Sequence, residues 1–293
     1  MTKTKIITLI CWSITALALL AIIALVIFGV GVDIQFMSFG DWGSFDVERV
    51  EYISPGDIDS ININWTSGRV NVIVHDGDDI IITEQSRREL RTRHQMTYTV
   101  ADGELNIRFV PSGTRGSIPS KRLEVQVPQN MLYGLSAFEV LTVSGRITLN
   151  GVDASDVTLR TTSGRITVND VDATNIDLRT TSGRIEARRV TAESIRSHTV
   201  SGRHSLSGAF GDVNMQSTSG RLYVSSSIVP ERIEARAVSG RIRVAVPNDG
   251  TPIHVDHRSN SGRFSSAMPI ITGGGNAQFT LRTTSGRITI AAY

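Results

Sequence analysis

Arginine is the residue of this sequence whose type and spacing are best suited to chemistry. The tripeptide Ser-Gly-Arg occurs nine times along the 293 residues. Its arginines are Arg69 in the first copy, and then Arg146, Arg165, Arg184, Arg203, Arg221, Arg241, Arg263 and Arg287. Guanidinium groups donate paired N–H groups to carboxylates and phosphates. A regular row of them predicts a linear face that binds an anionic polymer.

The same arginines have a second interpretation as ordinary solvated surface, in which each covers the edge of a turn. Neighbouring charges about 5 Å apart repel by about 1 kcal/mol in water. The planar guanidinium tolerates such stacking better than an ammonium group does, and no lysine follows residue 141. Acidic residues such as Asp177, Glu186 and Glu234 are expected to offset part of the repulsion. A second, partial polar column lies three residues before the repeat serines: Arg160, Arg179, His198, Gln216, Arg236, Arg258 and Arg282.

The spacing of the repeats indicates which elements position these side chains. From Ser144 onward, consecutive repeat serines are 19, 19, 19, 18, 20, 22 and 24 residues apart, a period typical of a solenoid. Apolar residues, mostly β-branched, occupy the positions six and four before each serine and three and five after it. This alternation predicts strands with one buried face. The predicted fold is therefore all-β: a parallel β-solenoid (β-helix) of ~20-residue coils, preceded by one N-terminal transmembrane α-helix.

The glycine of each copy is expected to shape a turn by adopting a positive φ, which glycine does readily. These turn glycines are Gly145, Gly164, Gly183, Gly202, Gly220, Gly240, Gly262 and Gly286. A second turn per coil is predicted at 150–155 (NGVDAS) and 169–174 (NDVDAT), where Asn and Asp are frequent. His204 and His257 occupy columns that are otherwise apolar, and we expect them in buried or edge positions.

The N-terminal segment predicts a membrane anchor. Residues 6–32 carry no charge and exceed the length of about 20 residues that a membrane-spanning helix needs. Because Lys3 and Lys5 precede this run, the N-terminus is expected in the cytoplasm and the C-terminal domain outside the cell. A cleaved signal peptide is the alternative, but its apolar core is usually about 7–15 residues long. We therefore predict a single-pass protein of the cell membrane.

The expected organisation has five parts. A cytoplasmic tail spans 1–5, the transmembrane helix 6–32 and an extracellular tether 33–50. An irregular N-terminal part of the solenoid spans 51–141 and acts as its cap, and the regular Ser-Gly-Arg coils span 142–293. The last coil, which ends near Tyr293, is expected to leave an open strand edge.

Charge and cysteine content add two constraints. Residues 33–141 contain 10 Lys and Arg against 16 Asp and Glu, whereas residues 142–293 contain 18 against 12. Such opposite charges suggest contacts with partners or between copies of the chain. The single cysteine, Cys11, lies in the apolar run, so no intrachain disulfide can form.

Other kinds of site find little support. His254, Asp256 and His257 form the stretch HVDH, but His257 points to the opposite face of a strand from the other two. We therefore predict no metal site and no cofactor. The nucleophile-elbow, zinc-protease and phosphate-loop motifs are absent, which argues against an enzyme. Nucleic acid is disfavoured as a partner because only the basic character supports it.

The repeat layout resembles the bacterial putative-adhesin family, an all-β repeat family often anchored by one N-terminal membrane helix. The resemblance rests on the repeated units SG-x-I/V/L-x-I/V/L, on LEVQVP at 123–128 and on ISPGDIDSININWTSGRVNVIV at 53–74, and it covers residues 51–293. It implies a parallel β-solenoid outside the cell.

These observations predict a membrane-anchored, non-enzymatic binding module of the cell surface or envelope. Its partner would be an anionic cell-wall polymer or glycan that contacts the turn arginines. The alternative is a structural or envelope-stress signalling scaffold. That scaffold would act through protein–protein contacts or self-association at the ends of the solenoid.

Overall fold

The computed structural model describes residues 47–110, 120–271 and 275–293, all of which lie in a compact unit spanning Gly43–Tyr293. The predicted cytoplasmic tail and membrane helix lie outside the described residues, as does most of the expected tether. Within the described ranges, no helix combines the length and apolar character needed to cross a membrane.

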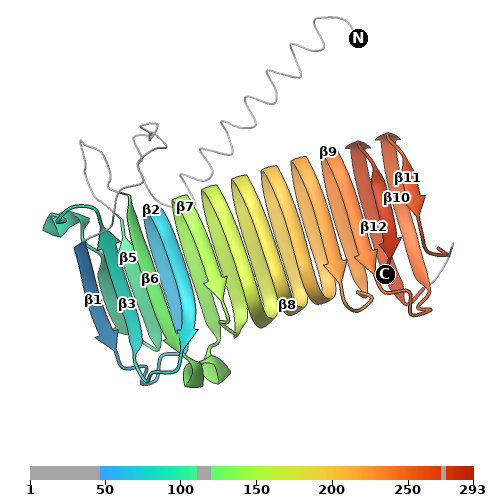
Figure 1. The fold of residues 1–293 in the computed structure, drawn as a ribbon. Coiled ribbons are helices and arrows are strands. Elements are labelled where there is room, and N and C mark those ends of the chain that lie inside the picture. Colours follow the sequence, from blue (N-terminus) through green and yellow to red (C-terminus); the bar gives the residue numbers. More distant parts are fainter. Residues whose placement is uncertain (1–46, 111–119, 272–274) are drawn as a thin grey trace, which may run out of the picture. The chain divides into compact units, whose positions relative to one another are not determined.

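The regular repeats wind into a stack of parallel strands, which confirms the all-β prediction (Figure 1). β7 (Ala137–Asn150) pairs with β8 (Ala154–Ser226), and β8 pairs with β9 (Arg232–Val246). β8 is continuous over 73 residues because its chain passes from coil to coil without leaving the sheet. The register aligns the repeat serines, with Ser144 opposite Ser163 and Ser219 opposite Ser239.

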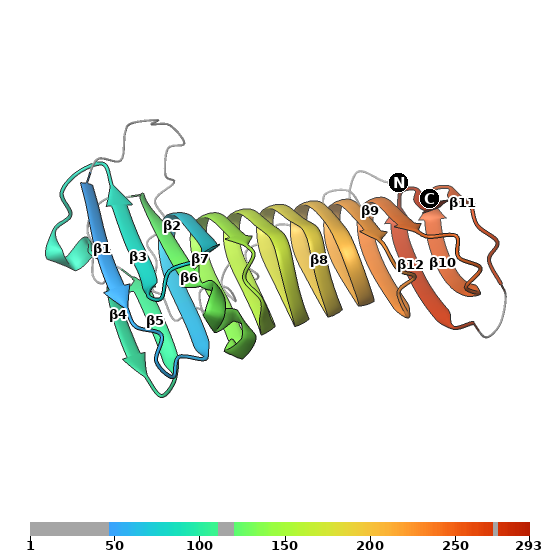
Figure 2. The same cartoon turned by 60° about the horizontal axis from the view of Figure 1, so that its bottom comes forward.

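The stack begins in the irregular N-terminal part, where parallel and antiparallel pairing meet. Its strands are β1 (Val47–Ile53), β2 (Ser60–His75), β3 (Ile80–Ser86), β4 (Thr97–Ala101), β5 (Glu104–Phe109) and β6 (Lys121–Pro128). β2 pairs in parallel with β7, β5 and β6. The outer pairs β1–β3, β3–β6 and β4–β5 are antiparallel, so the solenoid does not continue beyond them (Figure 2). Short 3₁₀ turns, η1 (Thr92–His94) and η2 (Gln129–Gly134), complete this part.

The last two coils stack in an order different from their order in the chain. β12 (Ala277–Ser285) and β13 (Ile288–Ala292) pair with β9, whereas β10 (Ile253–Ser261) and β11 (Phe264–Ser266) pair outside them. The terminal edge is therefore formed by β10 and β11 and not by the C-terminus (Figure 2). The hydroxyl of Tyr293, the last residue, bonds to the Ser226 carbonyl in an inner coil.

One continuous core runs through the stack. The apolar columns read from the sequence are its lining, and most of their members are fully buried. Polar residues two positions before the repeat serines, such as Thr142, Thr161 and Thr180, also face inward. At the N-terminal end Trp65 and Phe109 replace these small residues, and their rings pack with centroids 5.2 Å apart. These larger side chains are buried in the N-terminal part of the stack.

The turn glycines are required by close stacking more than by φ. Among the glycines of the nine Ser-Gly-Arg copies, only Gly68, Gly164, Gly183 and Gly286 have φ between 20° and 160°, so the positive φ expected at every turn glycine is wrong for the other five. A Cβ on any of the nine would lie closer than 3.0 Å to the backbone oxygen of the adjacent coil. The left-handed backbone instead occurs at the second turn of successive coils, at Gly151, Asp170 and Arg189.

Candidate anion-binding surface

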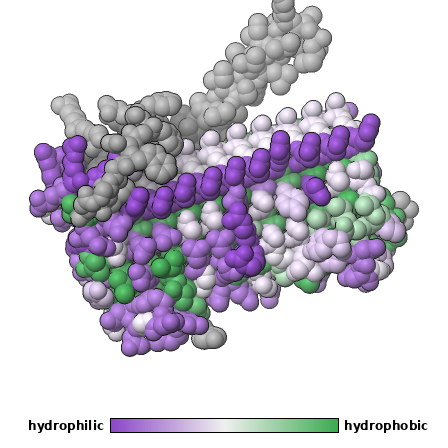
Figure 3. Space-filling view, viewed as in Figure 1, coloured by the Kyte–Doolittle hydropathy of each residue, from purple (hydrophilic) through white to green (hydrophobic). Residues whose placement is uncertain are grey.

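The turn arginines form one uninterrupted row along the stack. Arg69 pairs in register with Arg146, and Arg221 with Arg241. Arg287 and Arg263 continue the row in exchanged order. The amide of Ile242 donates to the Arg287 carbonyl at 2.9 Å, and the amide of Ile288 donates to the Arg263 carbonyl at 3.0 Å. Adjacent strands lie about 4.8 Å apart, which sets the spacing of the charges. Figure 3 shows a line of hydrophilic side chains beside a paler line along the stack, as in-register arginines and Ser-Gly pairs require.

Most of these side chains are exposed and carry no partner that would neutralise them. All are exposed except Arg165 and Arg184, which are half-buried. Among the described residues, Arg184 alone in the row forms an ion pair, to Glu186 at 3.2 Å. Glu186 offsets charge in the row at this one coil, as expected from the sequence. The rest of the row presents free guanidinium groups to solvent.

The mutual repulsion within the row is visible at Arg146. Partial burial lowers the pKa of the Arg146 guanidinium, and the positive charges of Arg69 and Arg165 lower it further. These two residues belong to the coils on either side. The row therefore concentrates positive charge along a line, and an anion placed beside it would relieve the repulsion.

The second polar column differs because carboxylates neutralise much of it. Arg160 and Arg179 both contact Asp177 at 2.9 Å. Arg236 pairs with Glu234, and Arg282 pairs with Asp256 at 3.0 Å. Arg179 and Arg236 use the carboxylate two residues earlier on the same strand, whereas Arg160 and Arg282 use the equivalent carboxylate of the adjacent coil. This column is thus a set of surface ion pairs rather than a second free cationic row.

The histidines occupy the positions expected from their columns. His204 is fully buried, and His257 is exposed on the edge strand β10, where its ring stacks on Phe264 with centroids 3.7 Å apart. Asp256 of the HVDH stretch is exposed and pairs with Arg282. In the part of the chain that the structure describes, no group of three or more His, Cys, Asp or Glu side chains is placed to hold a metal ion.

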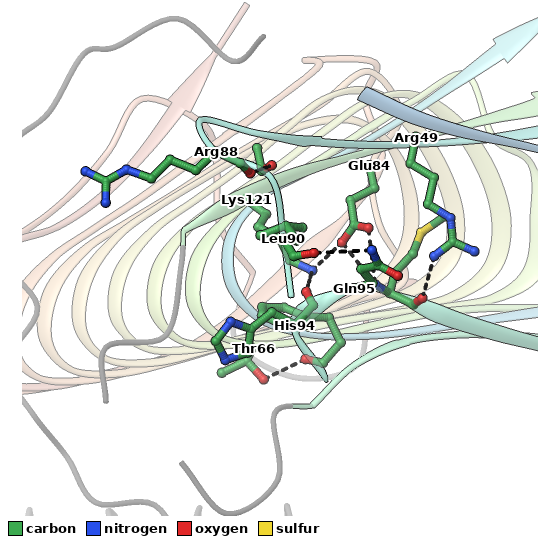
Figure 4. Close-up of polar contacts among 11 residues, drawn as sticks. Arg49, Thr66, Glu84, Arg88, Leu90, His94, Gln95 and Lys121 are labelled. Atoms are coloured by element: carbon green, nitrogen blue, oxygen red, sulfur yellow. Dashed lines mark hydrogen bonds and ion pairs between the residues drawn. The ribbon is translucent and has the colours of Figure 1, made fainter. Parts of the chain in front are cut away.

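A buried ion pair at the N-terminal end was missed by the sequence analysis. Lys121 is fully buried, and its ammonium donates to the Glu84 carboxylate and to the carbonyl of His94 at 2.6 Å (Figure 4). The Met96 amide donates to both Glu84 oxygens at 3.0 Å and 3.2 Å. The Lys121 ammonium also lies 3.3 Å from the centre of the Phe109 ring. Burial lowers the pKa of Lys121 to about 8, although Glu84 opposes this shift.

The repeat itself explains why Lys121 stands there. Lys121 pairs with Gly68 and Arg122 with Arg69, so Ser120-Lys121-Arg122 is a tenth, altered copy of Ser-Gly-Arg. Glycine is needed where the next coil lies against the turn. Among the described residues, the antiparallel strand β3 and not a further parallel coil pairs beyond β6, so a long side chain fits, and it bonds to Glu84 of β3. The tripeptide SKR was the signal that could have revealed this end of the stack.

Comparisons with known proteins identify the family and the fold. A family model described as Toastrack DUF4097 matches residues 58–291. No match was found among curated proteins. A putative adhesin from Bacteroides fragilis NCTC 9343 is similar over 83% of this chain and 96% of that chain, with 11% identity and a TM-score of 0.51.

Two structures from Parabacteroides distasonis ATCC 8503 are also similar. One, a putative lipid binding protein, covers 83% of this chain and 96% of its own, with 13% identity and a TM-score of 0.48. The other, a putative adhesin, covers 84% and 98%, with 16% identity and a TM-score of 0.47. The likeness to the Bacteroides fragilis protein extends to the fold.

Proposed function

The chain belongs to the Toastrack DUF4097 family. We propose that it is a membrane-anchored, non-enzymatic binding module of the cell envelope. Its ligand is an anionic polymer of the cell wall or an acidic glycan. The polymer lies along the turn arginines, and its successive anionic groups contact the arginines of successive coils. The description of the similar Bacteroides fragilis protein as a putative adhesin fits such a surface role.

The observation that carries this proposal is the free charge of the row. Surface arginines commonly pair with nearby carboxylates, as those of the second column do. The turn arginines instead repeat in register on every coil. Within the part of the chain that the structure describes, Arg184 is the one turn arginine that pairs with a carboxylate. A line of planar, weakly hydrated cations matches a polymer whose carboxylates or phosphates recur along its length.

The membrane anchor is supported by the sequence. Residues 6–32 are uncharged and follow Lys3 and Lys5. An anchor at this position places the stack on the outer side of the membrane. That side is where cell-wall polymers and foreign glycans are available to it.

Binding of a defined polyanion across a salt series tests this function. The full chain in detergent is titrated with polygalacturonate and with polyphosphate. Four turn arginines that lack a carboxylate partner are replaced together in the variant R146Q/R203Q/R221Q/R241Q. A matched control, R188Q/R196Q/R232Q/R243Q, removes the same charge outside the row.

We expect the intact chain to bind, and added salt to weaken the binding steeply because ions screen exposed charges. The row variant should lose at least about tenfold in affinity, since charge-assisted contacts are lost at four coils. The control should remain close to the intact chain. Equal losses in the two variants, or no binding at low salt, would remove the row as a binding face.

A second candidate function is a scaffold that self-associates at the stack end. The two ends differ, because antiparallel strands and the Lys121–Glu84 pair cover one of them whereas β10 forms an open edge at the other. Unpaired strand edges add further strands readily. Sedimentation of the full chain in detergent tests this: a concentration-dependent dimer that survives in the row variant supports it, and a monomer at all concentrations contradicts it.

A further inference from the structure

A hollow of about 440 Å³ lies on the outward face of the coils near the β10 end. Its volume falls in the range of about 300–1,000 Å³ that is usual for small-molecule sites. Residues from β8, β9, β10 and β12 line it, and because β8 contributes residues from two of its coils, the hollow crosses five neighbouring coils. It lies before the repeat serines, whereas the turn arginines follow them, so the Ser-Gly corner separates the two surfaces.

Three arginines cross the hollow in register. Arg236 pairs with Arg282, and Arg282 pairs with Arg258, each on an adjacent strand. All three are lining residues. Since strands are about 4.8 Å apart, the three guanidinium groups span about 10 Å. A ligand with one or two anionic groups could therefore contact several of them at once.

The charges around the hollow are only partly balanced. Arg236 is paired with Glu234 and Arg282 with Asp256, and both arginine side chains remain more than half exposed at 54% and 51%. Within the described ranges Arg258 forms no ion pair, because Asp256 on its own strand bonds to Arg282 instead. The hollow thus offers one uncompensated cation with two oriented guanidinium groups beside it, which suits a carboxylate better than a densely charged phosphate chain.

Several of the remaining lining groups are of the kinds that recognise sugars. Gln216 and Asn260 supply amides, and Thr218 and Thr284 supply hydroxyls. Amides and hydroxyls both donate and accept, as sugar hydroxyls do. Val238 lies among them with 53% of its surface exposed, and it provides an apolar contact for the C–H face of a ring.

The exchanged order of the last coils assembles this site. β12 enters between β9 and β10, and it places Arg282 between Arg236 and Arg258 with Asp256 of the outer coil holding its guanidinium. If the coils stacked in chain order, Arg258 would occupy the middle. The unpaired cation is therefore at the outermost coil, where a chain end or a side branch can enter.

We propose that this hollow binds a carboxylate-bearing sugar, such as a uronic acid unit of an acidic glycan. Arg258 binds the carboxylate and Arg282 supports it. Gln216 and Asn260 bond to ring hydroxyls, and Val238 contacts the ring face. This site is separate from the turn-arginine row and does not depend on it.

The test uses trigalacturonate as the probe, because a short oligomer spans too few turn arginines to hold well on the row. Its binding to the full chain in detergent is measured by calorimetry, beside galactose and inorganic phosphate. R258Q removes the unpaired cation. R243Q is the matched control, since Arg243 is an exposed arginine of β9 that does not line the hollow.

We expect R258Q to weaken trigalacturonate binding at least about tenfold, the usual effect of losing a charge-assisted hydrogen bond, while R243Q changes it less than twofold. V238D should weaken it as well, and R146Q/R203Q/R221Q/R241Q should leave it unchanged. Equal effects of R258Q and R243Q, undetectable binding, or displacement of the sugar by an equal concentration of phosphate would overturn the proposal. Loss in the row variant alone would move trigalacturonate to the row.

Discussion

The buried histidine His204 gives the stack a defined sensitivity to acid. Its ring occupies a column that is isoleucine in the two preceding coils, at Ile166 and Ile185. One ring nitrogen, Nδ1, lies 2.6 Å from the hydroxyl oxygen of Ser197, and Nε2 has no partner among the described residues. Burial, and to a lesser degree the nearby His198, lowers the pKa of His204 from 6.5 to about 3. The imidazole is therefore neutral in the folded protein.

The size of the effect follows from this pKa. Between pH 6.5 and pH 3 the unfolded chain binds a proton at His204 and the folded chain does not. The free energy of unfolding therefore falls as the pH falls, by about 1.4 kcal/mol per pH unit. At pH 5 the loss relative to neutral pH is about 2 kcal/mol. Other groups titrate in the same range, so the informative quantity is the difference between the intact chain and a variant.

The variant His204→Leu removes the titrating group, and Ser197→Ala/His204→Leu also removes the hydroxyl that it would leave unpaired. Urea unfolding of the full chain in detergent is followed by circular dichroism at pH 7.5, 6 and 5. We expect the intact chain to lose about 2 kcal/mol more than either variant between pH 7.5 and pH 5. Parallel pH profiles for the intact chain and both variants would refute a neutral, buried imidazole at this position.

Two further predictions concern the stacking of the coils. Gly183→Ala places a Cβ closer than 3.0 Å to the Gly164 carbonyl oxygen, whereas a Cβ at Gly134 meets nothing within 4 Å. We therefore expect Gly183→Ala to lower the free energy of unfolding by about 1–3 kcal/mol, with Gly134→Ala as the control. Comparable unfolding midpoints for the two variants would show that the coils separate easily. Lys121→Met leaves the buried Glu84 carboxylate without its cation and should lower the free energy of unfolding by about 3–5 kcal/mol. The double variant Lys121→Met/Glu84→Gln should recover much of this loss in the same unfolding measurement. If Lys121→Met is as stable as the intact chain, the ion pair contributes nothing to stability.

The sequence alone predicts the repeating unit. Periodic Ser-Gly-Arg copies and apolar columns such as Ile147, Ile166 and Ile185 fix the strands, their buried faces and the parallel register. They do so because a period of two residues is a local property of a strand, and a constant spacing repeats it in every coil. The row of turn arginines follows directly from that register.

The sequence does not show which exceptions to the pattern compensate one another. Ser197 and His204 each interrupt an apolar column, and within one coil they meet across the core. Lys121 replaces a turn glycine where an antiparallel strand, and not a parallel coil, lies beyond β6. Its partner Glu84 belongs to that strand and is 37 residues away in the chain. Such pairs depend on contacts between segments whose spacing carries no periodic signal.

The order of the last coils was likewise decided by the tertiary structure. Repeat spacing gives the length of each coil and says nothing of which neighbour it stacks on. The apolar columns of β10 and β12 are similar, so the sequence pattern does not distinguish which of them pairs with β9. In the folded protein β12 pairs with β9, and β10 pairs with β12. That choice moves the open edge from the C-terminus to β10, and it brings Arg236, Arg282 and Arg258 together in the hollow. Local sequence therefore determined the coil and its charged row, because both follow from patterns that recur in every repeat. Long-range packing determined the two ends of the stack and the site near one of them.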